Sequence, residues 1–195
     1  MKHPTKFLRS TSLTLLILSV TLSLAQGQQT FRQTGKVTIA IAGTSTLHNW
    51  EMTSDSGNCQ AVFTVGSDGK LEAVHSASFS TLAESLKSGK SPMDHNAYKA
   101  LKTNQFKDIS FQLTGGKVTG KNIQCKGNLT IAGTTKAVDL EAGWDINEKV
   151  TVLRLAKKIR MTDFDVTPPS FMFGSVTTGD EITIDIQLIL APVRA

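Results

Sequence analysis

Residues 181–190 read EITIDIQLIL. The polar side chains of Thr183, Asp185 and Gln187 alternate with apolar side chains at Ile182, Ile184, Ile186, Leu188 and Leu190. In a β-strand, successive side chains point to opposite faces, so this alternation places the apolar set on one side. The stretch therefore predicts a strand with one face in a core and the other in water.

The same alternation recurs along the chain and predicts about eight strands in all. Short turns join most of them, for example at residues 66–69 (GSDG) and 132–134 (AGT), and Gly115-Gly116 is expected to end the strand that begins near Ile109. Short connections favour antiparallel pairing of consecutive strands. A meander of this length usually closes on itself, which predicts an all-β fold, either an up-and-down barrel or a sandwich. The other seven strands are expected near 37–41, 61–65, 71–79, 109–114, 123–131, 138–144 and 150–161.

One segment of about 20 residues interrupts the β pattern. Thr81 and Glu84 have the spacing of a capping box, and Ser91, Pro92 and Asp94 are the residue types that begin a helix. We expect a short helical excursion that covers one end of the sheet, either as a structural plug or as a lid over a lumen. The apolar face of its second helix would carry Met93, Ala97, Ala100 and Leu101.

The segment 162–180 is predicted to be rich in loops. Pro168 and Pro169 cannot donate hydrogen bonds to a sheet, so the chain should leave the sheet there. Four apolar residues in this segment either pack under the loop or line an opening, and packing is the favoured interpretation. They are Phe164, Phe171, Met172 and Phe173.

Residues 1–25 have the features of a secretory signal peptide. Lys2, Lys6 and Arg9 precede an apolar run from Leu13 to Leu24, and small residues lead to a predicted cleavage site after Ala25. A membrane anchor is the alternative, but a spanning helix needs roughly 20 apolar residues. We expect residues 26–35 to be a polar linker and 36–195 to form one barrel domain. The protein would then be periplasmic or secreted, with no stable membrane insertion after cleavage.

Charge and cysteine content limit the possible partners. Without residues 1–25 the chain has 18 basic and 16 acidic residues, a net charge of +2. The cluster Lys157, Lys158 and Arg160 is interpreted as a solvated strand face, and no nucleic-acid partner is expected. Cys59 and Cys125 are compatible with one disulfide or with two free thiols, and the sequence leaves both open.

The motifs of enzymes and metal sites are not found in the sequence. His48, His75 and His95 lack metal-binding spacing, and there is no Gly-x-Ser-x-Gly motif. A carboxylate pair made of Asp163 and Asp165 is a weak candidate for hydrolysis. We therefore expect no enzyme activity, no catalytic residues, no metal and no cofactor.

Several motifs, in order, resemble those of YceI-like proteins, from about Lys36 to Leu190. The first is 45–52 (STLHNWEM), and the most recognisable is 127–138 (GNLTIAGTTKAV). The others are Met93-Asp94 followed by 98–102 (YKALK), 106–111 (FKDISF), 161–166 (MTDFDV) and 179–184 (GDEITI). The sequence departs from the family pattern at Met93, where the family usually has an arginine.

The resemblance implies an antiparallel, eight-stranded, lipocalin-like barrel that is commonly periplasmic. Its apolar lumen would hold a polyisoprenoid or another long-chain lipid, as carrier or by sequestration, with no assigned catalytic residues. The alternatives are a secreted module that binds a protein or matrix partner through its surface and, less favoured, a hydrolase using His48 or His95. The oligomeric state is not predicted. Alternation predicts the inward-facing residues, most of them core and a minority touching ligand: Ile39, Trp50, Phe63, Phe79, Phe111, Leu129, Trp144 and Ile184.

Overall fold

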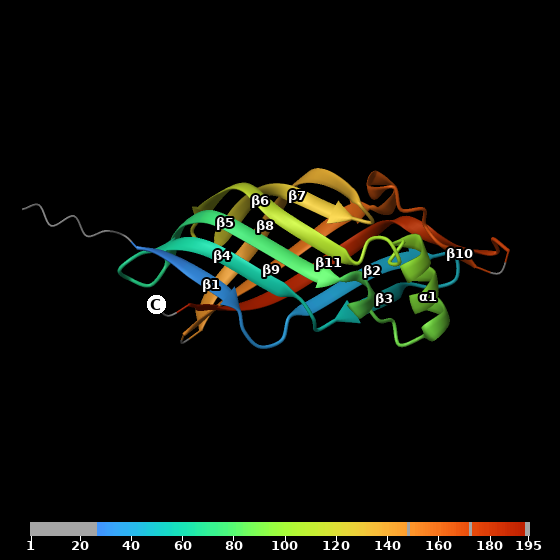
Figure 1. The fold of residues 1–195 in the computed structure, drawn as a ribbon, viewed down its shortest axis with the longest axis horizontal. Coiled ribbons are helices and arrows are strands. Elements are labelled where there is room, and N and C mark those ends of the chain that lie inside the picture. The colour runs from blue at the N-terminus through green and yellow to red at the C-terminus, as the bar shows by residue number, and fades with distance from the viewer. Residues whose placement is uncertain (1–26, 148, 172, 194–195) are drawn as a thin grey trace, which may run out of the picture.

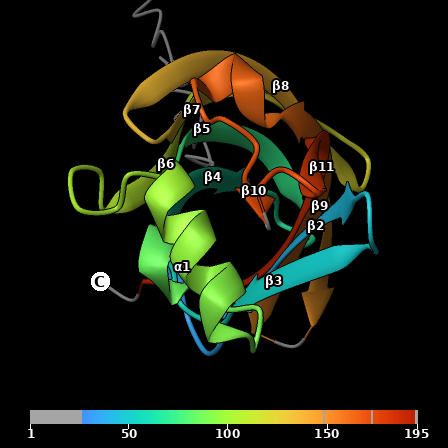
Figure 2. The same ribbon diagram turned by 90° about the vertical axis from the view of Figure 1, so that its right-hand side faces the viewer.

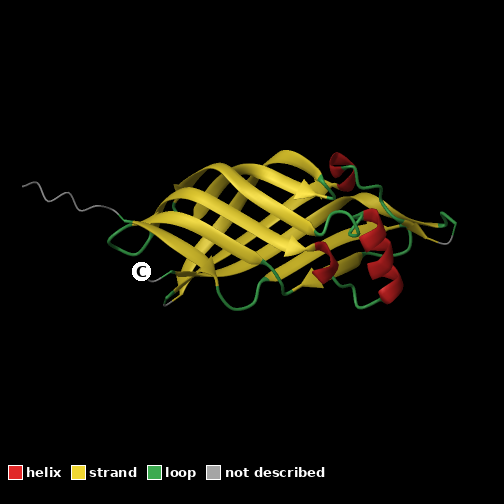
Figure 3. Cartoon of the chain, viewed as in Figure 1, coloured by secondary structure: helices red, strands yellow, loops and turns green. Residues whose placement is uncertain are grey.

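The computed structural model describes residues 27–147, 149–171 and 173–193. They form eleven strands, one α-helix and two short 3₁₀-helices (Figures 1 and 3). The predicted signal peptide and Met172 lie outside the described residues. In chain order the elements are β1 (Gln28–Gln33), β2 (Thr38–Ser45), β3 (Trp50–Ser54), β4 (Asn58–Val65), β5 (Leu71–Leu82), η1 (Ala83–Ser85), α1 (Ser91–Ala100), β6 (Asp108–Thr119), β7 (Asn122–Ile131), β8 (Thr134–Asn147), β9 (Val150–Arg160), η2 (Met161–Phe164), β10 (Ser170–Phe171) and β11 (Val176–Pro192).

The sheet closes into a barrel of eight antiparallel strands. Their order is β1-β4-β5-β6-β7-β8-β9-β11, and β11 pairs back to β1. This confirms the predicted all-β barrel and excludes the sandwich. The 17-residue β11 pairs with β2 from Thr178 to Gln187 and with β1 from Leu190 to Pro192. The β2–β3 hairpin therefore widens the wall toward one end of the barrel.

The first strand lies where a polar linker was predicted, so that boundary is wrong. Residues 28–33 form β1, which pairs with β4 on one side and β11 on the other. Phe31 is buried at 5% exposure, and its ring packs edge-on against Phe63 with 5.4 Å between centroids. Because two neighbouring strands supply the backbone hydrogen bonds, one inward aromatic residue is enough to anchor an otherwise polar strand.

The prediction that Gly115-Gly116 ends a strand is also wrong. The strand β6 runs on to Thr119 with a bulge between Leu113 and Gly115, and the turn falls at Gly120. A Cβ on Gly116 would stand 2.6 Å from Val74 Cγ1 of the neighbouring strand, so glycine is required there by close packing. The predicted turns at 66–69 and 132–134 are confirmed.

The helical excursion exists, but its first part is shorter than predicted. Thr81 belongs to β5, and its hydroxyl donates to the Ser56 carbonyl (2.7 Å) rather than capping a helix. Only the three-residue η1 follows. Helix α1 begins at Ser91 with Lys90, not Ser91, in the N-cap position. The helix lies across one end of the barrel, called the mouth below (Figure 2).

The segment before the last strand contains more β-structure than predicted. Strand β11 begins at Val176, and the two-residue β10 pairs with its start as a hairpin. Phe164 is buried at 2% exposure and packs with Val166, as expected. Phe171 and Phe173 are exposed, so the expected packing under the loop is wrong for these two residues.

Candidate functional site: the barrel lumen

The barrel encloses a cavity of about 580 Å³, called the lumen below. Its walls are the inward side chains of strands β2 to β9 and β11, and they are almost entirely apolar. Ligand pockets typically measure roughly 300–1,000 Å³ and have mainly apolar linings. The lumen therefore has the size and chemistry of a site for an apolar molecule.

The structure places seven of the eight predicted residues on the lumen wall: Ile39, Trp50, Phe63, Phe79, Phe111, Leu129 and Ile184. The eighth, Trp144, faces inward but does not line the lumen. Its indole Nε1 donates to the Gly120 carbonyl (3.0 Å), and the side chain is 5% exposed. Trp144 is close in sequence to the β8–β9 turn. That turn lies at the end of the barrel away from α1 (Figure 1).

That far end is packed shut. Val37 and Leu190 are essentially inaccessible there, in one core cluster with Phe31, Phe63 and Trp144. Close packing of this kind leaves no room for a second apolar molecule. The lumen is thus closed at this end and extends toward the mouth.

Helix α1 covers the mouth. The predicted face of Met93, Ala97, Ala100 and Leu101 lines the lumen, and none of the residues of α1 is fully buried. The helix therefore rests on the opening as a cover and does not fill the barrel as a plug.

Polar contacts of Tyr98 and Asp94 hold this cover. The single proton of the Tyr98 hydroxyl is shared between the carbonyls of Leu86 (2.7 Å) and Glu84 (3.0 Å), and the hydroxyl oxygen accepts from Lys87 Nζ (2.6 Å). The Asp94 carboxylate accepts from the backbone N–H (2.7 Å) and hydroxyl (2.6 Å) of Ser88, and these bonds lower the pKa of Asp94. The start of α1 is thereby tied to the segment that follows β5.

Two lysines are the charged residues of the lumen wall, Lys90 at the mouth and Lys157 on β9. No ion pair among the described residues involves either of them. The sequence interpretation overlooked Lys157, because it grouped this residue with Lys158 and Arg160. Lys157 lies two residues from both Leu155 and Ile159, and side chains two apart in a strand share a face, so the alternation alone places Lys157 inward.

The two cysteines are free thiols and both line the lumen. Cys59 lies on β4 and Cys125 on β7, with β5 and β6 between them in the wall, so the disulfide alternative is excluded. Burial raises the pKa of the Cys59 thiol to about 12 and also raises that of Cys125. Both thiols are therefore protonated and poorly nucleophilic at neutral pH.

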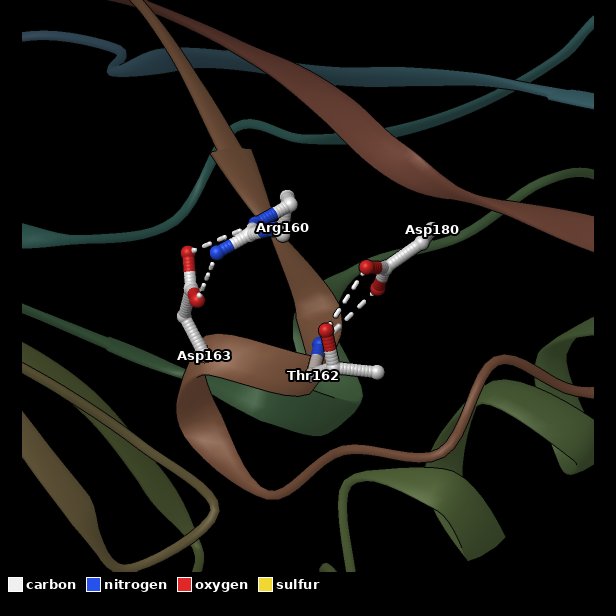
Figure 4. A network of polar contacts seen from close by, with 4 residues as sticks. All are labelled: Arg160, Thr162, Asp163 and Asp180. Carbon is white, nitrogen blue, oxygen red and sulfur yellow. Dashed lines mark hydrogen bonds and ion pairs between the residues drawn. The ribbon is translucent and has the colours of Figure 1, made fainter.

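The carboxylates around η2 hold this short helix against the wall of the barrel. The strands β8 and β9 pair only between Ala142–Asn147 and Val150–Leu155, and η2 contacts both strands beyond that point. Asp163 accepts from Arg160 (Nη2 to Oδ1, 2.9 Å), and Asp180 accepts from the backbone and hydroxyl of Thr162 (Figure 4). These contacts fix η2 between β9 and β11 and lower the pKa of Asp180.

No catalytic grouping is found among the residues that the structure describes. Asp165 accepts from the Thr134 hydroxyl (2.9 Å), apart from the Asp163 contact, so the two acids do not form a pair. His75 contacts the Thr64 hydroxyl (2.7 Å) and His48 the Asn49 carbonyl (2.8 Å). In the same described ranges, no three metal-ligating side chains gather at one point.

The sequence profile of the YceI-like domain matches residues 34–190. The chain belongs to the YceI-like family. Three solved structures share the fold of this YceI-like chain. Burkholderia cenocepacia BcnA has a TM-score of 0.66 at 15% identity, covering 78% of this chain and 95% of that chain. The Campylobacter jejuni YCEI protein has a TM-score of 0.54 at 20% identity, covering 72% of this chain and 85% of that chain.

The third structure is a polyisoprenoid binding domain from Saccharophagus degradans, implicated in plant cell wall breakdown. It has a TM-score of 0.61 at 9% identity and covers 84% of the YceI-like chain and 98% of its own. At these identities the likeness establishes the fold alone. The chain has no significant sequence match among curated proteins. Within the ranges described for this YceI-like protein, no helix is long and apolar enough to cross a bilayer.

Proposed function

We propose that this chain is an exported, soluble protein that holds a polyisoprenoid or a similar long-chain lipid in its lumen, as a carrier or by sequestration. The observation that carries the proposal is the apolar lumen of about 580 Å³, closed at one end. Membership of the YceI-like family supports it. So does the fold shared with a polyisoprenoid binding domain. Export is inferred from the sequence of residues 1–25.

The physical basis of binding is burial of apolar surface. Each Å² of apolar surface removed from water contributes roughly 25 cal/mol. A long hydrocarbon chain therefore gains affinity along its whole length without a precise set of polar partners. The proposed contacts are the seven predicted residues that line the lumen, while Trp144 is assigned to the core of the closed end.

Lipid extraction tests this function. The protein is purified from its own host without detergent, and its bound lipids are identified by native mass spectrometry and by extraction. The test variant is Ala97→Trp, which places a large ring inside the mouth. Ala137→Trp, at an exposed site on β8, is the matched control.

We expect a long-chain lipid in the natural protein and in the control, and at least a tenfold lower content in Ala97→Trp. A protein that carries no lipid and takes none up from a polyisoprenoid suspension would refute the proposal. Equal lipid content in all three proteins would place the lipid outside the lumen.

Exposed Phe171 and Phe173 favour the second candidate, a module that acts through its surface. That candidate leaves the apolar lumen without a role, and we rank it second.

A further inference from the structure

The β10–β11 hairpin carries an aromatic residue away from the body of the barrel. Its strands pair through Ser170–Thr177 and Phe171–Val176, and the Gly174 N–H donates to the Phe171 carbonyl (3.2 Å). The hairpin extends beyond the mouth along the long axis of the molecule (Figures 1 and 2). The side chain of Phe173 is fully exposed there.

A second turn supports the hairpin and adds another apolar side chain. The backbone N–H of Thr46 donates to the Thr177 carbonyl (3.0 Å), and the Thr177 N–H donates to the Thr46 hydroxyl (3.2 Å). The next residue, Leu47, is 70% exposed, and Phe171 is 51% exposed. We call Leu47, Phe171 and Phe173 the apolar rim.

The apolar rim is continuous with the lumen. Leu47 and Phe171 both line the lumen, although both also face solvent. Apolar side chains therefore run from the interior of the barrel to Leu47 and Phe171 at its edge, and Phe173 follows in the turn of the same hairpin. Single exposed apolar residues are common on proteins, but a set continuous with an apolar cavity is not explained by chance exposure.

The rim segments themselves carry no charge, and the charged side chains that line the lumen and its mouth are both lysines. Residues 39–50 and 166–179, which carry the rim, contain no Asp or Glu. Lys90 lines the mouth, and Lys87 lies beside it. Three carboxylates also lie nearby: Asp94 and Asp180, which accept hydrogen bonds from Ser88 and Thr162, and Glu51, which lines the neighbouring groove together with Lys87 and Lys90.

We propose that the apolar rim inserts into the surface of an anionic lipid bilayer and seats the mouth of the lumen on it. Exposed aromatic and aliphatic side chains flanked by lysines match the hydrocarbon boundary and the phosphate layer of such a surface. A typical protein partner needs about 800 Å² of buried surface on each side, more than three side chains offer. Insertion into a lipid interface has no such requirement.

Docking of this kind removes the aqueous step from lipid transfer. A lipid tail that leaves the bilayer between Leu47 and Phe171 enters the lumen without exposing its length to water, which is the costly part of transfer. The docking is reversible, since only side chains at turns enter the interface. This inference rests on the proposed function for its purpose, but vesicle binding is measured independently of lumen content.

Vesicle flotation tests the docking. The exported protein is mixed with vesicles of phosphatidylcholine alone or with 30% phosphatidylglycerol, at about 0.02 M and 0.5 M salt, where screening differs strongly. The variants are Phe173→Ser and the pair Leu47→Ser/Phe171→Ser. Val193→Ser is the matched control, because Val193 is 45% exposed near the end of β11, away from the mouth.

We expect the natural protein and Val193→Ser to float with the anionic vesicles at low salt. Phe173→Ser should bind at least fivefold less, and the double variant should not float. In Phe173→Trp, the added tryptophan should show quenching by brominated lipids. Unchanged binding of the rim variants, or no binding by the natural protein, would overturn the inference.

The remaining outcomes separate the two proposals. Rim variants that lose vesicle binding but keep lumen lipid support docking and the proposed function together. Rim-dependent flotation by a protein with an empty lumen would keep the docking and remove the proposed function. Rim-dependent cross-linking to a host protein, without flotation, would replace the bilayer by a protein partner and refute this inference.

Discussion

The indole ring of Trp50 lies directly over Gly43 on the neighbouring strand. The two residues are opposite each other in the β2–β3 register, and a Cβ on Gly43 would stand 2.3 Å from Trp50 Cζ2. The indole Nε1 donates to the Thr44 carbonyl (2.9 Å), which fixes the ring in this position. Glycine at 43 thus lets a large ring lie flat in the lumen wall near the mouth.

The first prediction concerns this contact. Gly43→Ala should displace the Trp50 ring and destabilise the protein by about 1–3 kcal/mol, the usual cost of overpacking. Urea unfolding followed by tryptophan fluorescence measures both effects. Gly115→Ala is the control, since no atom lies within 4 Å of the added Cβ, and it should change stability by less than about 0.5 kcal/mol. Equal stability of Gly43→Ala and the natural protein would contradict the packing described for Trp50.

The second prediction is a pH dependence due to Cys59. Burial raises the pKa of this thiol from 9.0 to about 12, so the folded state keeps its proton where the unfolded state loses it. The contribution is constant below pH 9 and declines between pH 9 and 12, by at most about 1.4 kcal/mol per pH unit. Urea unfolding at pH 8 and 10.5 should show a steeper loss in the natural protein than in Cys59→Ala. Parallel pH profiles would disprove the thiol as the source.

The third prediction assigns Trp144 to the closed end. Trp144→Phe removes the hydrogen bond to the Gly120 carbonyl and some core volume, at a cost of about 1–3 kcal/mol. The lipid content of the lumen should not change, because Trp144 does not line it. Thermal unfolding and lipid extraction measure the two quantities. A changed lipid content would return Trp144 to the ligand contacts.

The fourth prediction concerns the cover of the mouth. Tyr98→Phe removes the hydroxyl that binds Leu86, Glu84 and Lys87, and should loosen α1. We expect at least a threefold faster release of bound lipid to acceptor vesicles, with about 1–2 kcal/mol lower stability. Lys99→Ala, on the exposed side of the same helix, is the control. Release at the natural rate would mean that α1 does not limit exit.

Alternation could predict which side chains face inward, but not how deep they lie. Ile184 and Trp144 have the same inward pattern, yet one lines the lumen and the other belongs to the closed end. A period of two reports the face of a strand, whereas depth depends on strand stagger and closure of the barrel. The same alternation places Lys157 on the inward face with Leu155 and Ile159, although its charge groups it with Lys158 and Arg160.

Other errors have equally specific causes. Strand β1 is polar except for Phe31, so its pairing with β4 and β11 leaves little periodic signal. Gly115-Gly116 has the composition of a turn, but the strand continues through a bulge there, and only Gly116 is required, by the close approach of Val74. Recognition of the family, and not alternation, favoured the barrel over the sandwich. The exposure of Phe173 depends on the β10–β11 hairpin. Strand β10 has only two residues, which is too short for an alternating pattern to be visible in the sequence.

The sealing of one end by Phe31, Phe63 and Trp144 gives the barrel a polarity. Under the proposed function, a linear lipid cannot pass straight through a barrel with a single opening, so it would leave by the route it entered. Its hydrocarbon end would enter first, because the far wall offers only apolar contacts, and its polar end would stay beside Lys90. The closed end would thus set the orientation of the lipid and present the same end of every molecule to whatever receives it.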